Sequence, residues 1–81
     1  MLIRSQSGNS LINLNHSVGI GITEAFDGVL IMCQSTTDDY KLGKYSSMEK
    51  AIKVIDEIER CYVELPPNSI YYMPADDEVE V

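Results

Sequence analysis

The sequence is poor in the residues from which most catalytic centres are built. It holds one histidine, His16, and two cysteines, Cys33 and Cys61, none of them at metal-ligand spacing. Because structural zinc needs four close ligands, this pattern disfavours a zinc site. Both cysteines lie in apolar segments, so we interpret them as reduced core residues, and His16 as a turn residue. We therefore predict a protein that is not an enzyme and has no metal or cofactor.

Positive charge is also scarce. Six Lys and Arg residues stand against thirteen Asp and Glu residues, and four of these acids lie in residues 76–80. The net charge of −7 argues against binding of nucleic acid over a broad surface, because nucleic acid is polyanionic, although one small basic pocket stays possible. The sequence shows no signal peptide and no apolar run near the roughly 18 residues that span a membrane. We expect a cytoplasmic protein.

Tryptophan is absent and phenylalanine occurs once, so the five tyrosines supply most of the aromatic surface. The 81 residues suffice for one domain, and 44% of them are apolar, which is enough for a core. A domain of this size buries only about 60–65% of its unfolded surface, so self-association would add stability. We predict a single α+β domain over residues 1–74, followed by an acidic C-terminal tail over residues 75–81.

Alternation of large and small or polar residues predicts a series of short strands. Asp27-Gly28 is the clearest hairpin turn, and Gly43 marks an expected bulge. The run Val29–Cys33 is apolar throughout, which predicts a strand covered on both faces. The expected strands are residues 2–5, 10–14, 18–23, 29–33, 40–45 and 69–73, the first two forming a hairpin.

One helix is predicted from Ser47 to Tyr62. Ser46 and Glu49 have the spacing of a capping box before it, and Pro66-Pro67 ends it. An apolar stripe at three- and four-residue spacing should face the core. Its members are Met48, Ala51, Ile52, Ile55, Ile58 and Tyr62. The expected architecture is an antiparallel sheet of four or five strands with one long C-terminal helix packed on one face.

Half of the positive charge lies on predicted strands beside glutamine and tyrosine side chains. Bases next to tyrosines can hold a small phosphate-bearing ligand through charge-assisted hydrogen bonds and stacking. The alternative is a solvated sheet edge, which lysines protect from aggregation. The candidate ligand-binding residues are Arg4, Gln6, Tyr40, Lys41, Lys44 and Tyr45.

Several segments resemble a group of small proteins encoded by phages and prophages of Gram-positive bacteria. They are residues 3–6, 42–47, 49–51, 54–58 and 73–79, with the strand, the "LGKYSS" turn and the helix in that order. The resemblance implies an activity against host defence. Some such proteins look like oligomeric sponges for cyclic or ADP-ribose-type immune signals, and others are acidic inhibitors of CRISPR nucleases. It assigns no residue a role.

We therefore expect a homo-oligomer that sequesters a small phosphorylated nucleotide in the infected bacterial cell. Exposed apolar surface beside a single helix favours self-association, and a symmetric dimer is the commonest form. An acidic protein-binding inhibitor, with residues 76–80 docking on a basic groove, is the alternative. A non-enzymatic phage regulatory protein is a further alternative.

Overall fold

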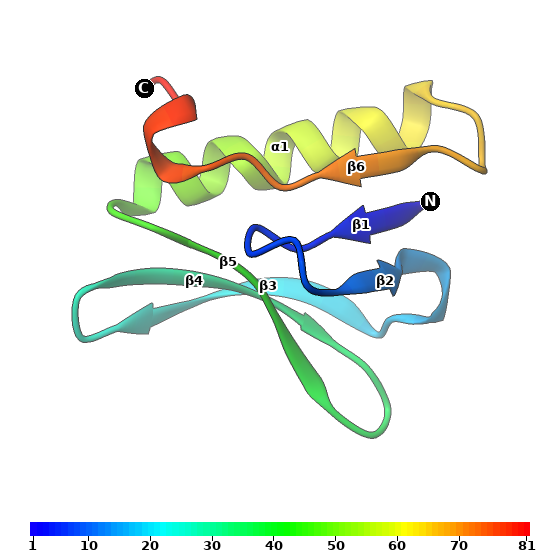
Figure 1. The fold of residues 1–81 in the computed structure, drawn as a ribbon, viewed down its shortest axis with the longest axis horizontal. Helices are drawn as coiled ribbons and strands as arrows, with labels where there is room; N and C mark the ends of the chain where they lie inside the picture. The colour runs from blue at the N-terminus through cyan, green and yellow to red at the C-terminus, as the bar shows by residue number, and fades with distance from the viewer.

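The computed structural model describes residues 1–81, except for the side chain of His16, so the interpretation of His16 lies outside what it describes. The chain is an α+β protein (Figure 1). No helix in the described chain is both long and apolar enough to cross a membrane. The elements are β1 (Leu2–Arg4), β2 (Leu11–Asn13), a 3-10 turn (Leu14–His16), β3 (Gly19–Ala25), β4 (Gly28–Gln34), β5 (Asp39–Tyr45), α1 (Met48–Glu64), β6 (Ile70–Tyr72) and a second 3-10 turn (Asp76–Glu78).

The strands form two sheets of three, in the orders β2-β1-β6 and β3-β4-β5. The prediction of one antiparallel sheet of four or five strands is therefore wrong in its finer part. The 3-10 turn after β2 separates the β1–β2 hairpin, which was predicted, from β3. Helix α1 then returns the chain, so that β6 pairs with β1 in parallel, Ile3 opposite Tyr71. The last strand thus joins the first sheet rather than extending the second.

The predicted hairpin is confirmed, but its turn consists of Phe26 and Asp27, and Gly28 is the first residue of β4, paired with Ala25. Glycine is required there because a Cβ atom would lie 2.7 Å from the carbonyl oxygen of Tyr45. The bulge in β5 is also present. Ile31 pairs with Gly43 and the next residue of β4 pairs with Lys41, so Leu42 is the extra residue.

Helix α1 begins one residue later than the expected capping box. Ser47, not Ser46, is the N-cap, and its hydroxyl accepts a hydrogen bond from the backbone N–H of Lys50 at 3.3 Å. At the other end Leu65 is extended, as the residue before a proline prefers. The predicted buried stripe is partly wrong. The buried residues are Ala51, Val54 and Ile58, while Met48, Ile52 and Tyr62 are exposed.

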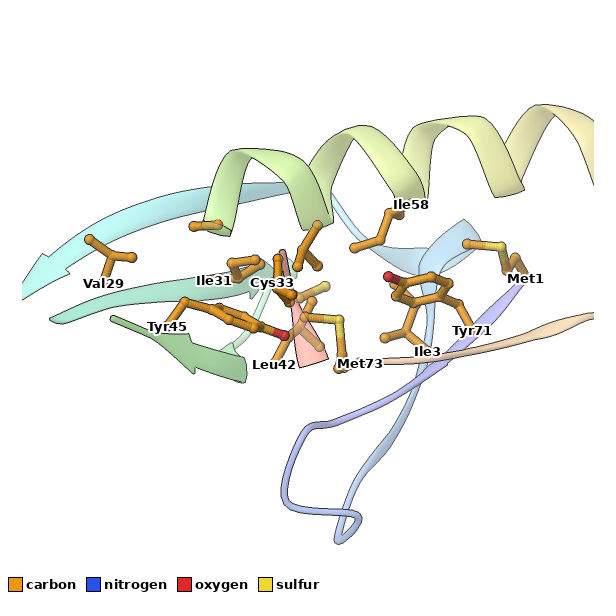
Figure 2. Packing of buried hydrophobic residues seen from close by; sticks show 13 residues of the cluster. Met1, Ile3, Val29, Ile31, Cys33, Leu42, Tyr45, Ile58, Tyr71 and Met73 are labelled. Carbon is orange, nitrogen blue, oxygen red and sulfur yellow. The ribbon is translucent and has the colours of Figure 1, made fainter. Parts of the chain in front are cut away.

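One core lies between α1 and the two sheets (Figure 2). Its most deeply buried large side chains come from β1, β4 and β5: Ile3, Ile31, Cys33, Leu42 and Tyr45. Figure 2 shows Ile58 pointing from α1 toward Tyr71 of β6. Because both sheets contribute to the same cluster, their relative position is fixed by packing as well as by hydrogen bonds.

The two faces of β4 differ in burial. Val29, Ile31 and Cys33 face the core and are buried, whereas Leu30 and Met32 point to the other face and are half-buried. The prediction that this strand is covered on both faces is therefore not met within one chain. An apolar strip on the outer face of β3-β4-β5 is left partly open to solvent.

Candidate functional site

The predicted ligand residues divide into two groups, and the first lies where the two sheets meet. The Gln6 side chain accepts from the backbone N–H of Lys44 at 2.9 Å and donates to the Lys44 carbonyl at 3.1 Å. It also donates to the carbonyl of Pro74 at 3.1 Å. The backbone N–H of Gln6 donates to Leu42 at 2.7 Å. Gln6 therefore joins the first hairpin to β5 and to the C-terminal segment.

Tyr45 completes the same junction. Its ring is buried, and its hydroxyl donates to the Pro74 carbonyl at 2.7 Å. Burial, with a smaller contribution from the charge of Asp76, raises the pKa of this hydroxyl to about 12. A Cβ atom on Gly43 would lie 3.1 Å from the Tyr45 ring and 3.3 Å from Cβ of Gln6. Gly43 thus lets the two side chains approach β5 closely.

The junction brings together residues from three separate segments of the chain. Gln6, Gly43, Tyr45 and Pro74 meet there in one hydrogen-bonded cluster. The polar atoms of Gln6 and Tyr45 are engaged by the protein itself. These two residues hold the fold together and are not free to grip a ligand.

Lys44 faces outward beside this junction and is neutralised locally. Its ammonium group lies 2.5 Å from the carboxylate of Asp27 in the β3–β4 turn. The hydrogen bond and the positive charge of Lys44 lower the pKa of the Asp27 carboxyl. The nearby surface hollow is also lined by Asp76, so it offers two negative charges against one positive charge. An anion finds little net attraction there.

The second group lies at the other end of β5. Tyr40 is exposed and forms one wall of a groove of about 440 Å³, which is the clearest candidate ligand site. The opposite wall is β2, and serine hydroxyls lie along the rim. The lining residues are Ser10, Leu11, Ile12, Asn13, Ser17, Ser35 and Tyr40. We call this the Tyr40 groove.

Part of the polar lining of the Tyr40 groove is committed to the protein. The Ser35 hydroxyl bridges the Ser35–Asp38 turn, donating to the Asp38 carbonyl at 2.7 Å. The Ser17 hydroxyl donates to the Asn13 carbonyl at 3.3 Å and lies 2.9 Å from the Cys33 sulfur. These bonds fix the rim, while Ser10 and Tyr40 face the open volume.

Strand register places Arg4 next to this groove but turns Lys41 away from it. Arg4 is paired with Leu11, a groove residue, and paired residues on neighbouring strands have their side chains on one face. Its guanidinium donates to the Gly8 carbonyl at 3.3 Å and lies 6.0 Å from the centre of the Tyr72 ring. Lys41 directly follows Tyr40 and is exposed on the opposite face of β5.

The C-terminal acidic segment lies against α1. A carboxylate oxygen of Asp76 accepts from the backbone N–H of Ser46 at 2.8 Å, and Lys50 lies 3.5 Å from the other oxygen. The backbone hydrogen bond, followed by the Lys50 charge, lowers the pKa of the Asp76 carboxyl. Val79 joins the core cluster. The segment is therefore held in place, with Asp77 and Glu80 exposed.

Nucleophiles and metal ligands are sparse in the described structure. Cys33 is buried and Cys61 half-buried, and both are free thiols, as predicted. No three His, Cys, Asp or Glu side chains among the described residues are grouped closely enough for a metal ion. The buried Tyr71 hydroxyl donates to Glu57 at 2.6 Å, and burial with this bond raises its pKa well above the usual range. Its role is in the core.

Sequence reasoning singled out Tyr40 but missed the groove around it. Four lining residues are Ser and Asn side chains from turns and a short strand, and Ser10 and Asn13 come to Tyr40 because the first hairpin lies against β5. Comparison of the chain with protein-family models, curated proteins and solved structures finds no match to any of them. The site must therefore be argued from its geometry.

Proposed function

We propose that this chain is a non-enzymatic binding protein that sequesters a small nucleotide-type ligand, acting as a homo-oligomer in the infected bacterial cell. The observation that carries the proposal is the Tyr40 groove, where an exposed aromatic ring shares the lining with strand β2 and with three serines that lie outside that strand. Its volume of about 440 Å³ lies within the range of small-molecule sites.

The chemistry of the Tyr40 groove suits a flat heterocycle attached to a polyol. A nucleobase can stack on the Tyr40 ring, and such stacking contributes about 1–3 kcal/mol per base. Ribose hydroxyls and base edges need short-range donors and acceptors, which Ser10 and Asn13 provide from β2 and its approach. The apolar side chains of Leu11 and Ile12 complete the wall.

Charge around the groove selects the phosphate end. Arg4 lies beside Leu11 through the β1–β2 pairing, whereas Lys41 lies on the opposite face of β5. A guanidinium binds phosphate oxygens through paired hydrogen bonds, so Arg4 is the proposed phosphate ligand. Of the six residues predicted from the sequence, Arg4 and Tyr40 remain in the proposed site, whereas Lys41 lies outside it on the opposite face of β5. Gln6, Lys44 and Tyr45 are reassigned to the junction.

The biological setting of the proposal rests on the resemblance to phage-encoded proteins. In that setting the ligand is an immune signal of cyclic-nucleotide or ADP-ribose type, and binding without turnover removes it from its receptor. Self-association is supported by the half-buried Leu30 and Met32 on the open face of the second sheet. Sequestration requires tight binding and slow release of the ligand.

The proposal is tested by calorimetric titration of the purified protein with ADP-ribose and with cyclic di-AMP. We expect one of the two to bind, and Tyr40→Ala to weaken that binding at least tenfold, because the stacking surface is lost. Tyr40→Phe should bind as the natural protein does. Leu65→Ala removes a similarly exposed apolar side chain outside the groove and serves as the matched control, whereas Tyr72 is unsuitable because its ring lies beside Arg4.

Two results would count against this function. The proposed ligand class would be wrong if neither probe binds below millimolar concentration. Native mass spectrometry of protein from infected cells would then show no adduct. Binding that Tyr40→Ala leaves unchanged would remove the Tyr40 groove as its location. A chain without a ligand would fit a non-enzymatic phage regulatory protein.

A second function, acidic inhibition of a host nuclease, is favoured by the fixed C-terminal segment. Because Val79 and Asp76 anchor this segment, Asp77 and Glu80 stand at defined places on the surface. A fixed pair of carboxylates can dock on a basic groove. Removal of the whole segment would also remove core contacts, so Asp77→Asn with Glu80→Gln is the cleaner test. Nuclease inhibition that disappears in this double variant would favour the second function.

A further inference from the structure

Strand β3 is the less protected edge of the second sheet. It pairs with β4 continuously from Gly19 to Ala25 and has no neighbour on its other side in the described sheet. Its only charged residue is Glu24, and it contains neither lysine nor proline. The other edge strand, β5, carries Lys41, Lys44 and a bulge. Soluble proteins guard edges with such features, so the regular edge of β3 is suited to pairing with another strand.

A fully exposed phenylalanine stands at one end of this edge. Phe26 is the only phenylalanine of the chain and lies in the two-residue turn between β3 and β4. The turn is well supported, because Asp27 pairs with Lys44 at 2.5 Å and Gly28 lies directly against the Tyr45 carbonyl. A large apolar side chain on a supported turn costs little entropy to bury, as in the anchor residues of interfaces.

An apolar groove lies at the other end of the same strand. It has a volume of about 350 Å³ and runs between the start of β3 and the second half of α1. Val18 and Ile20 form one side, and Ile55, Tyr62 and Val63 form the other. Val18, Tyr62 and Val63 are exposed in the single chain. We call this the Val18 groove.

We propose that two copies of this chain pair antiparallel through β3, with the two-fold axis at Ile22. This proposal rests on the self-association proposed above and places it at the sheet edge, so that Leu30 and Met32 on the outer face stay outside the interface. In an antiparallel pair centred on Ile22, each residue lies opposite the one whose number adds with its own to 44. Phe26 of one copy therefore lies opposite Val18 of the other, at the mouth of the Val18 groove, and the contact occurs twice by symmetry.

The side chains that this register brings together are compatible. Glu24 lies opposite Ile20 of the other copy, so the two carboxylates are kept apart. Gly21 lies opposite Thr23, and a Cβ atom placed on Gly21 would have no described atom within 4 Å, so the contact is uncrowded. Even-numbered residues of β3 face the helix side in both copies, because Ile20 and Ile22 pair with Cys33 and Ile31 of the core. The result is one six-stranded sheet with both helices on the same face.

A stable dimer buries about 1,200 Å² or more in total, and filling both grooves supplies part of that area. A buried phenylalanine removes about 150–250 Å² from solvent, and the dimer buries two of them in addition to the paired strands. The first test is sedimentation equilibrium. We expect Phe26→Ala to raise the dimer dissociation constant at least about a hundredfold, since two anchors are lost. Tyr72→Ala, an exposed aromatic on the other sheet, is the matched control and should leave it unchanged.

Cysteine cross-linking tests the register itself, in a Cys61→Ser background. The double variant Gly21→Cys, Thr23→Cys should form a disulfide-linked dimer, because positions 21 and 23 lie directly opposite in the proposed pair. Each single variant should not, because its two copies lie diagonally, about 7–8 Å apart. A cross-link in the Gly21→Cys variant alone would indicate a register centred on 21 and overturn the one proposed.

The remaining outcomes separate the interface from the function. A dimer that neither Phe26→Ala nor the paired cysteines affects would overturn the β3 interface and leave self-association standing. A monomer at all concentrations would overturn both, while nucleotide binding by the Tyr40 groove would still be decided by calorimetry.

Discussion

Replacement of Gln6 by methionine tests the conclusion that this side chain, predicted from the sequence to bind a ligand, instead stabilises the fold. Methionine keeps the length and most of the volume of the side chain but cannot form its hydrogen bonds. The variant loses three side-chain bonds, two to the backbone of Lys44 and one to the Pro74 carbonyl. At about 0.5–1.5 kcal/mol each, their loss should lower the free energy of unfolding by about 2–4 kcal/mol.

That loss is large for a chain of this size. At roughly 0.05–0.15 kcal/mol per residue, 81 residues give a free energy of unfolding of about 4–12 kcal/mol. A change of about 2–4 kcal/mol should therefore lower the melting temperature by at least about 10 °C. Urea unfolding followed by circular dichroism measures the change, with Gln34→Met as control, because Gln34 is the exposed last residue of β4.

The reasoning is refuted if Gln6→Met unfolds at the same urea concentration as the natural protein. Loss of nucleotide binding in a variant of unchanged stability would return Gln6 to the ligand site that was predicted from the sequence. Loss of stability with binding retained at low temperature would place it in the junction. The two measurements together therefore decide between the roles.

Three further perturbations probe the same network and its surroundings. Gly43→Ala should destabilise the chain by about 1–3 kcal/mol in urea unfolding, because its methyl group would crowd Tyr45, whereas Gly21→Ala, placed in open space, should be neutral or slightly stabilising. The pKa of the Asp76 carboxyl is lowered in the folded state. The ionised carboxylate therefore stabilises the fold above the unfolded pKa of about 4, and this stabilisation is lost as pH falls through the folded pKa. Asp76→Asn should reduce the acid sensitivity of unfolding. The pKa of Tyr45 is raised to about 12 in the folded state. The neutral hydroxyl therefore contributes fully to stability below a pH of about 10, and this contribution is lost as pH rises toward 12. Tyr45→Phe should flatten the alkaline arm of a plot of stability against pH, and an unchanged arm would contradict this.

Local features of the fold were predictable from the sequence. The Asp27-Gly28 turn, the bulge near Gly43 and the helix before Pro66-Pro67 are set by residues close together in the chain. The exact helix start was not, because Ser46 and Ser47 are both good N-caps. In the structure Ser47 has the extended backbone and the side-chain hydrogen bond of the N-cap. The backbone N–H of Ser46 instead donates to the Asp76 carboxylate.

Non-local features could not be predicted in the same way. No pattern in Ile70–Tyr72 states that its partner is β1, since the alternation of a short strand is equally compatible with a place in either sheet. The helix stripe failed for a related reason. Val54 and Ile52 are equally apolar, and only the direction from which β4 and β5 approach α1 buries the first and exposes the second.

The candidate site shows the same division. Bases beside tyrosines suggested one pocket, but period and register place Lys44 and Tyr45 at one end of β5 and Tyr40 at the other. Gln6 could have been recognised as structural only with knowledge that the first hairpin lies against β5. When long-range contacts bury a polar residue, the neighbouring residues in the sequence do not indicate its burial.

The parallel pairing of β1 with β6 also bears on the order in which the chain folds. More than sixty residues separate these strands, compared with two in the β3–β4 turn. This is roughly five doublings of loop length, which costs about 3 kcal/mol of closure entropy before any contact between the strands forms. The β3-β4-β5 meander and α1 therefore have an advantage in forming early, and the first sheet closes last. Strand β1 can pair with β6 only after the last residues of the chain have reached it. Until that pairing forms, the apolar side of β1 remains exposed to other chains.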